Sequence, residues 1–391
     1  MDDYLKGWMI MAWGREYDVI VVGAGFAGIM AAAVASGYGA RTALVSLGPG
    51  SFALGSACLS FGELLSTGEK GVRAKWAEKG ILEKALHAFK EISAAAGYDY
   101  KGAIDNAICL LTATGNFQEV HLAPISLASI SKGKGNRRGL VVGIRQLADF
   151  DANFIAEALA NEAKCRGLSA EYYACVVELP QVPREKLMGA LEISRYIGDR
   201  GFRDRFISML RNIKGDAEEI ILPGVLGLDW GTREFKELEE EVGCTVGEIP
   251  TLPPSVPGVR VFRCLINYLK RKGVHLYMGF PAQDLVLEKN RCVGITVRVP
   301  GKKLFIKGQV TILATGKSGL AESDTLLGIP LDKSKRVYAN EDLQLLSIEG
   351  NLVSRNILVA GSLLGDEGEK SGNAGALLTG YYAGSLAAGG M

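Results

Sequence analysis

The first strongly ordered pattern in the sequence is an apolar run that leads into a group of glycines. Val19–Val22 are four consecutive β-branched residues, which is typical of a parallel strand covered on both faces. Glycines in G-x-G-x-x-G spacing follow this run, and the small apolar residues 29–36 predict a helix. A second apolar run at residues 43–45 predicts the next strand. Tyr17–Ser46 is therefore predicted to form one strand–turn–helix–strand unit.

Further along the chain, apolar strand patterns alternate with helical patterns, which is typical of an α/β protein with a parallel sheet. Residues 274–316 differ, because several strand patterns joined by short turns lead into the buried run Val310–Ala314. This order predicts a β-meander that ends in a core strand. Elsewhere, strands are predicted at 140–144, 169–179, 218–228 and 356–365, and helices at 70–96, 154–165, 201–213, 233–241, 262–273 and 371–388.

Two stretches are predicted to be irregular connectors. Ile249–Val261 contains four prolines, so we expect neither a helix nor a central strand there, but a stiff segment that fixes the position of Arg260. Ser129–Gly139 is basic and contains glycine, which predicts a solvated hairpin or linker; contact with an acidic partner surface is the alternative.

Composition narrows the class of protein. The 391 residues suffice for more than one domain, and the 50 glycines suit tight turns and close backbone approach to a ligand. A net charge of +1 gives no argument for nucleic acid as a partner. The seven cysteines are scattered and form no C-x-x-C motif, which argues against a bound zinc ion or iron–sulfur cluster in this chain. Their odd number favours a protein of the reducing cytoplasm. The apolar start at residues 1–16 is too short to span a bilayer, so we expect a loosely packed extension; contact with a partner or a membrane surface is the alternative. No later apolar run is long enough for a membrane span either.

The glycine turn has the context of a dinucleotide-binding site. Gly23 permits the tight turn, Gly25 lets the backbone approach a pyrophosphate, and Gly28 lets the helix pack on the sheet. The start of the helix also offers unpaired N–H groups and the positive end of its dipole. A glycine-rich turn without a ligand is the alternative, but the strand before the motif and the helix after it favour binding.

Ser46 stands where such units usually carry an acidic residue, at the end of the second strand. That carboxylate would bind the hydroxyls of the adenosine ribose, whereas serine lacks both the charge and the bidentate geometry. We therefore expect either that the protein binds the adenosine ribose less tightly or that its ligand has no adenosine half.

Two later stretches are expected to join the glycine turn. Thr311–Gly316 is an apolar strand ending in Ala-Thr-Gly after a β-meander, which resembles a recurrent feature of glutathione-reductase-like flavoproteins. The resemblance implies that this strand returns the chain beside the first turn. After the strand at 356–365, Gly361 is followed by Ser362, where FAD enzymes place an acid for the ribitol, and Asp366 comes a few residues later. The helix after it would point its first amides at the flavin pyrimidine edge and stabilise negative charge on reduced flavin, although small residues also suit simple helix packing.

A loop rich in glycine and serine, Gly55–Ser60, is expected to cross the cofactor. Its Cys58 is predicted to be a packed small residue rather than a redox thiol. The predicted cofactor-binding residues are Gly23, Ala24, Gly25, Phe26, Ala27, Gly28, Ser46, Gly55, Ser56, Thr315, Gly316, Gly361, Ser362, Gly372, Asn373, Ala374 and Gly375.

These segments, in this order and with an α/β insertion between them, resemble FAD-dependent oxidoreductases of the succinate dehydrogenase and fumarate reductase type. The insertion is similar to that of the B subunits of anaerobic glycerol-3-phosphate dehydrogenases. The stretches "RGLVVGIRQLADFDANFIAEAL", "LPGVLGLD" and above all "PTLPPSVPGVR" carry this resemblance, which covers nearly the whole chain.

The resemblance implies a fold and a set of partners. The fold would be α/β: a Rossmann-like, glutathione-reductase-type flavin-binding domain with a β-meander (residues 1–74 and 259–391) and an inserted α/β cap or substrate domain (residues 75–258). The partners would be a catalytic A-type flavoprotein subunit and an iron–sulfur subunit that anchors the complex at the cytoplasmic side of the inner membrane. The complex would oxidise sn-glycerol 3-phosphate to dihydroxyacetone phosphate and pass electrons toward quinone. The fold favours FAD as the cofactor, whereas the family's B subunits favour FMN.

Residues for the chemistry are harder to assign from the sequence. Arg260 suits a phosphate, with a buried or interface ion pair as an equal alternative, and Asp229 is a weaker catalytic candidate. His87, His121 and His275 lie outside any motif and are expected to be structural. Without an obvious base, electron relay is favoured over independent catalysis. The alternatives are a scaffold subunit that has lost its flavin and a stand-alone flavin oxidoreductase on another small acid or alcohol.

Overall fold

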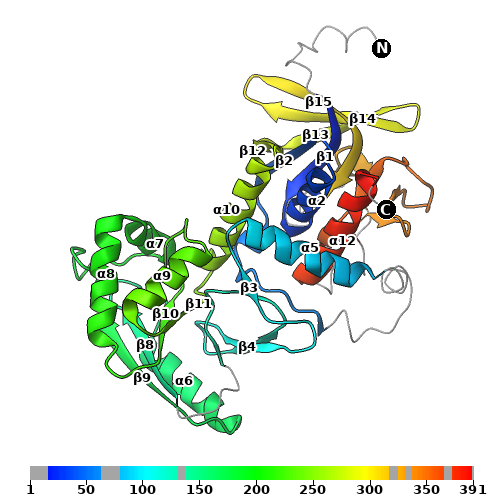
Figure 1. Cartoon of the computed structure of the whole chain (residues 1–391). Coiled ribbons are helices and arrows are strands. Elements are labelled where there is room, and N and C mark those ends of the chain that lie inside the picture. Colours follow the sequence, from blue (N-terminus) through cyan, green and yellow to red (C-terminus); the bar gives the residue numbers. More distant parts are fainter. Residues whose placement is uncertain are drawn as a thin grey trace. The chain divides into compact units, whose positions relative to one another are not determined.

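The computed structural model describes residues 16–62, 80–130, 137–316, 325–331, 337–364 and 372–389 (Figure 1). The chain divides into two compact units. The first comprises Met1–Ser51, Phe61–Ile92 and Leu265–Met391, and the second comprises Phe52–Ser60 and Ser93–Cys264. The domain boundaries predicted at 74/75 and 258/259 stay a prediction. Asp366 and the predicted N-terminal extension up to residue 15 lie outside the described residues.

The first unit is built on a seven-stranded sheet that joins a parallel part to an antiparallel meander. Its strands are β1 (Glu16–Ala24), β2 (Thr42–Pro49), β12 (His275–Met278), β13 (Ala282–Glu288), β14 (Arg291–Val299), β15 (Lys302–Leu313) and β20 (Ile357–Val359). The strands β12, β2, β1 and β15 are parallel neighbours, and β20 pairs in parallel with the last part of β15. The meander β13–β14–β15 therefore feeds directly into the parallel core, which confirms the predicted Rossmann-like α/β fold.

Helices α2 (Phe26–Gly37) and α12 (Gly372–Ala387) lie side by side against this sheet (Figure 1). Ten of the α2 residues are buried, as expected for a helix covered on all sides. The two helices approach closely because glycines face α2: a Cβ on Gly380 would lie 2.4 Å from the Ala27 oxygen. Helix α5 (Ile81–Ala95) adds an edge-to-face contact between Phe89 and Phe26.

The second unit contains a four-stranded parallel sheet in the order β11-β10-β8-β9. The strands of this sheet are β8 (Arg137–Ile144), β9 (Ala170–Val177), β10 (Glu219–Pro223) and β11 (Thr245–Ile249). The helices of the second unit are α6 (Ala152–Cys165), α7 (Ala190–Gly198), α8 (Arg200–Ile213), α9 (Thr232–Val242) and the first part of α10 (Val256–Arg271). Short antiparallel pairs complete it, formed by β3 (Tyr100–Lys101), β4 (Ile108–Leu111), β5 (Phe117–Val120), β6 (Ala123–Pro124) and β7 (Ser129–Ile130).

The proline-rich segment is only partly the connector that its composition predicts. Its first residue ends β11, and helix α10 already begins at Val256, so the prediction of an irregular Val256–Val261 was wrong. Pro257 falls in the first turn of α10, where the N–H that proline lacks would have no helical partner. The irregular part is therefore confined to residues 250–255.

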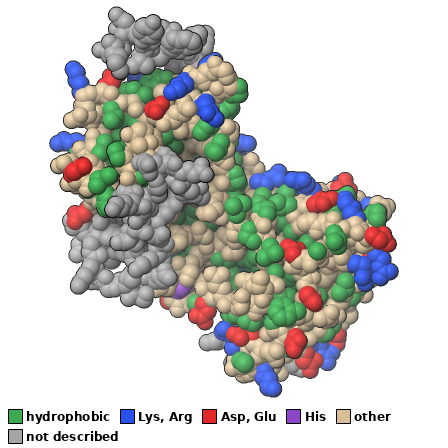
Figure 2. Space-filling model, turned by 180° about the vertical axis from the view of Figure 1, so that it is seen from behind, with side chains coloured by type: hydrophobic (Ala, Val, Ile, Leu, Met, Phe, Trp, Pro, Cys, Tyr) green, Lys and Arg blue, Asp and Glu red, His purple; other side chains and the backbone are tan. Residues whose placement is uncertain are grey.

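No helix among the described residues is long and apolar enough to cross a membrane. On the face drawn in Figure 2, the described Lys and Arg side chains are interspersed with Asp and Glu. This mixture agrees with the net charge of +1.

Candidate functional site

Two glycines of the β1–α2 turn are required by the packing of the protein itself. Gly23 has a φ of +112°, and a Cβ on it would lie 2.2 Å from the Ala314 oxygen at the end of β15. A Cβ on Gly28 would lie 1.9 Å from the Gly23 oxygen, so only glycine lets α2 start this close to the turn. The turn and the end of β15 are thus neighbours, as the strand "TILATG" predicts.

Gly25 is different, because nothing in the described part of the chain requires a glycine there. Its backbone is extended (φ −71°, ψ 175°), and the nearest described atom to the place of a Cβ is the Ala314 oxygen, at 4.0 Å. Gly25 is the N-cap of α2, which has no side-chain cap and no acidic residue in its first turn. The open space beside the positive end of a buried helix fits the phosphate groups of a nucleotide cofactor.

The loop after β2 runs close to this open position. A Cβ on Gly50 would lie 2.5 Å from the Gly25 Cα, and Pro49 is aligned with Ala24 in the β1–β2 pairing. Gly50 is a neighbour of the glycine turn that is absent from the predicted cofactor-binding residues, although the Gly-Pro-Gly at 48–50 is a signal for a close approach.

Ser46 is occupied by local hydrogen bonds at the end of β2. Its hydroxyl donates to the Gly48 oxygen at 2.7 Å, and its own carbonyl accepts the N–H groups of Gly279 and Phe280. The hydroxyl proton is therefore used within the loop, and only oxygen lone pairs are left for a ribose. Weaker binding of an adenosine ribose and a ligand without an adenosine half, the two alternatives expected from the sequence, both stay predictions.

The end of β15, the turn η2 (Gly361–Leu363) and the middle of α12, at Thr379 and Gly380, lie beside the start of α2. A Cβ on Gly316 would lie 3.5 Å from the Ser362 Oγ, and one on Gly361 would lie 3.0 Å from the Ala27 Cβ. The Gly361 N–H donates to the Thr379 hydroxyl at 2.9 Å, which ties η2 to α12. The structure thus brings the C-terminal segments η2 and α12 and the end of β15 together with the β1–α2 turn near the N-terminus.

The first turn of α12 supplies the last part of this site. Gly372 is exposed with a φ of +50°, and Ala374 and Gly375 are buried. This first turn has no acidic residue, so no carboxylate of the turn itself offsets the positive end of the helix dipole. Such an end favours an electron-rich group beside it.

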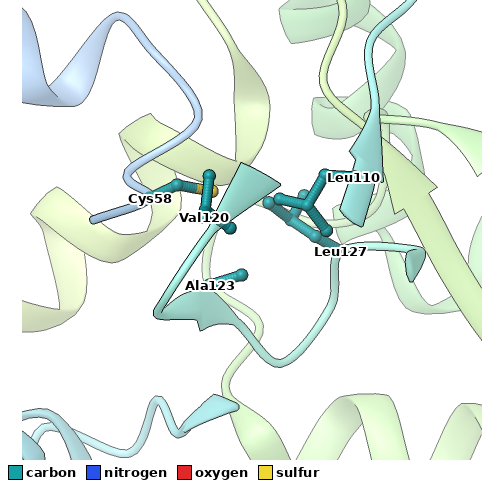
Figure 3. Packing of buried hydrophobic residues seen from close by; sticks show 5 residues of the cluster. All are labelled: Cys58, Leu110, Val120, Ala123 and Leu127. Atoms are coloured by element: carbon teal, nitrogen blue, oxygen red, sulfur yellow. The ribbon is translucent and has the colours of Figure 1, made fainter. Parts of the chain in front are cut away.

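Gly55 and Ser56 belong to the second unit, and their role at the cofactor stays a prediction. The Ser56 hydroxyl accepts the N–H of Cys58 at 3.4 Å. Cys58 packs in a buried cluster with Leu110, Val120, Ala123 and Leu127 (Figure 3). Burial raises the pKa of its thiol to about 12, so the thiolate needed for redox chemistry is disfavoured. The packing interpretation of Cys58 is confirmed.

Arg260 is a fully buried partner of an ion pair. Both Nη atoms donate to the Glu248 carboxylate, Nη1 to Oε2 at 2.6 Å and Nη2 to Oε1 at 3.2 Å. The Nη1 also donates to the Tyr98 hydroxyl, and the Nη2 also donates to the Leu226 oxygen. The Nε donates to the Gly227 oxygen. Burial by itself lowers the pKa of Arg260, but the Glu248 carboxylate outweighs it and the pKa is raised. All five N–H groups have acceptors, so the ion-pair alternative is confirmed and no N–H remains for a substrate phosphate.

Asp229 and the histidines show no catalytic arrangement in the described residues. Asp229 is exposed and bonds to the Arg263 Nη2 at 2.6 Å, so its catalytic role stays a prediction. The His275 Nδ1 lies 2.8 Å from the Tyr17 hydroxyl within the sheet region, and His87 pairs with Glu91 on the surface.

Comparison with known proteins identifies the class. Residues 18–329 match the family model described as "FAD binding domain", and the chain belongs to this family of flavoproteins. Its cofactor is accordingly a flavin, mainly FAD, and the glycine turn with its open Gly25 fits such a nucleotide.

Among named relatives, the chain is similar to B subunits of anaerobic glycerol-3-phosphate dehydrogenase. It is 24% identical to the probable B subunit from Halobacterium salinarum, over 95% of this chain and 98% of that protein. It is 26% identical to the B subunit from Yersinia pestis, over 77% of this chain and 74% of that protein. Among solved structures, the open conformation of a flavocytochrome c3 fumarate reductase matches with a TM-score of 0.45 and 11% identity, over 100% of this chain and 81% of that one.

Proposed function

We propose that this protein is the flavin-carrying B subunit of an anaerobic glycerol-3-phosphate dehydrogenase complex. The complex oxidises sn-glycerol 3-phosphate to dihydroxyacetone phosphate and passes the electrons toward quinone. The observation that carries the proposal is the similarity to such B subunits over 95% of the chain, in a protein of the FAD-binding family.

Within this proposal, the residues of the first unit have distinct tasks. The amides around Gly25 to Gly28 hold the cofactor phosphates, and Thr315, Gly316, Gly361 and Ser362 line the flavin-bearing part. A flavin held by these residues would supply the redox chemistry of the relay, because a flavin can take up and give off electrons singly or in pairs. The first turn of α12, Gly372–Gly375, stabilises negative charge with its N–H groups and dipole.

The subunit acts as an electron relay beside a catalytic A-type subunit, and an iron–sulfur subunit anchors the complex at the membrane. Two observations support relay over independent catalysis. Arg260 has no N–H left for a substrate, and the Cys58 thiol is protonated and packed. Neither residue offers the base that oxidation of a secondary alcohol requires.

The test is to purify the chain alone and with its partner subunits. We expect both preparations to show bound flavin, with FAD released by acid, and only the complex to reduce a dye with sn-glycerol 3-phosphate. A chain without flavin in either preparation would favour the scaffold alternative. Turnover by the chain alone on another small acid or alcohol would favour the stand-alone oxidoreductase.

A further inference from the structure

A surface hollow of about 450 Å³ lies in the second unit, where the segment after β9 meets helices α7 and α8. Residues 180–182 line it from that segment, Arg195 and Tyr196 from α7, and Phe202 and Arg205 from α8. Phe202 is buried and the other lining residues are half-buried or exposed, so the hollow opens to solvent. None of them is among the predicted cofactor-binding residues, so the flavin site does not explain this hollow.

The wall after β9 is held in one conformation by a fully buried glutamine. The Leu179 N–H donates to the Gln146 Oε1 at 3.1 Å, and the Gln146 Nε2 donates to the Val182 oxygen at 3.4 Å. Between them, Gln181 has a φ of +62°, and its Oε1 accepts a hydrogen bond from the Arg205 Nη2 at 3.0 Å. The hollow is therefore preformed, which reduces the entropy cost of binding a partner there.

The two arginines of the hollow carry positive charge that no carboxylate neutralises. Residues 195–205 contain four arginines and two aspartates. Most other arginines of the second unit bind a carboxylate. By contrast, Arg205 binds the neutral Gln181, and Arg195 has no ion pair or hydrogen bond with any described residue. A negatively charged partner would supply what these two guanidinium groups lack.

The other side chains of the hollow fit a protein partner. Asp199, the carboxylate in its lining, is already used, because its Oδ1 accepts the Phe202 N–H at 3.0 Å and caps α8. The ring of Phe202 lies 5.6 Å from that of Tyr196, which is 38% exposed. Tyrosine and arginine are among the side chains that contribute most to the stability of protein interfaces.

We propose that this hollow docks an acidic segment of a partner protein chain. Arg195 and Arg205 bind its carboxylates, and Tyr196 packs against an adjacent apolar side chain. A hollow with an exposed rim suits a segment of another protein, because the rest of the partner surface covers the rim. Docking uses no residue of the redox chemistry and therefore agrees with electron relay. That the partner is another subunit of a glycerol-3-phosphate dehydrogenase complex rests on the proposed function.

The test measures assembly of the flavin-loaded full chain with its partner subunits for the wild type, Arg195→Gln and Arg195→Glu. We expect the Kd to rise about tenfold for Arg195→Gln, as for a lost hydrogen bond to a charged group, and further for the charge reversal. Unfolding temperature and flavin content should not change, because Arg195 has no described partner to lose. Added salt should weaken assembly of the wild type more than that of Arg195→Gln. Arg233→Gln, an exposed arginine on α9 outside the hollow, is the matched control.

A second measurement separates this inference from the proposed function. A peptide with one tyrosine flanked by glutamates is titrated calorimetrically into the full chain alone, beside a peptide with glutamines in their place. We expect only the glutamate peptide to bind, and Arg195→Glu to abolish its binding. If binding or assembly depends on Arg195 in this way but no preparation oxidises sn-glycerol 3-phosphate, the docking site stands and the proposed function fails.

Two results would overturn the docking site. One is that Arg195→Glu leaves both assembly and peptide binding at the wild-type level. The other is that the glutamate peptide does not bind and the chain forms no complex with the partner subunits.

Discussion

At the scale of single residues, the three glycines of the G-x-G-x-x-G motif are needed for different physical reasons. Gly23 and Gly28 are required by the protein's own backbone, whereas the space at Gly25 is open. One spacing pattern in the sequence therefore contains both a folding requirement and a binding requirement. Substitution of each glycine by alanine tells the two apart.

Gly25→Ala should leave the free energy of unfolding of the flavin-free protein within about 1 kcal/mol, because the backbone there suits alanine. Its flavin occupancy should fall, since the added methyl fills the open space. Gly28→Ala should instead lose about 2 kcal/mol of stability through the clash with the Gly23 oxygen. Denaturant unfolding and the flavin absorbance per protein measure both effects. Equal flavin loss without any difference in stability would contradict this division.

Cys58 should resist alkylation in the native protein at neutral to mildly alkaline pH, because burial raises its pKa from 9.0 to about 12. The exposed Cys165 is the internal control and should react first. The raised pKa contributes stability below pH 9 that is lost as the pH rises toward 12, because the unfolded chain releases the proton first. Mass spectrometry after timed alkylation checks the order; rapid native labelling of Cys58 would refute it.

At the scale of elements, small residues and one buried ion pair decide which helices and strands touch. Helix α12 reaches α2 only because Gly380 and Gly384 carry no side chain. In the second unit, Arg260 on α10 binds Glu248 on β11 and backbone oxygens after β10, which ties three elements together.

Gly380→Ala should cost about 2 kcal/mol, because its methyl would press on the Ala27 backbone. Since Ala27 belongs to the first turn of α2, flavin occupancy should fall as well. Gly37→Ala, at the open end of α2, is the matched control and should be neutral or slightly stabilising. Thermal unfolding and flavin content are the measurements; equal behaviour of the two variants would argue against close helix packing.

Arg260→Met should destabilise the protein by about 3–5 kcal/mol, because it leaves the Glu248 carboxylate buried without its partner. The double variant Arg260→Met, Glu248→Leu should recover part of that loss. Arg263→Ala, which breaks the exposed pair with Asp229, should change stability by less than about 1 kcal/mol. Urea unfolding compares them. A stable Arg260→Met protein with lost turnover would instead revive a role in substrate binding.

At the scale of the whole molecule, the chain interrupts one unit with another. The flavin-type unit is assembled from three separate pieces of sequence, and the second unit carries its own parallel sheet. Alternating strand and helix patterns predict most of the longer elements, but they do not predict β11 and α7, nor short strands such as β3 and β4. Thr245–Ile249 is short, with a central glycine, and Ala190–Gly198 is a nine-residue helix, so neither has a pattern long enough to decide.

The sequence by itself determined the β1–α2–β2 unit, the meander and the flavin class, because glycine spacing and apolar periodicity are local properties of the chain. Only the tertiary structure decided what Arg260 contacts, and that of the three glycines Gly25 alone has no described atom close to the place of a Cβ. Each of these depends on atoms that are distant in sequence: Ala314 meets Gly23, and Tyr98 meets Arg260. Such contacts follow from packing of whole elements, which no local pattern encodes.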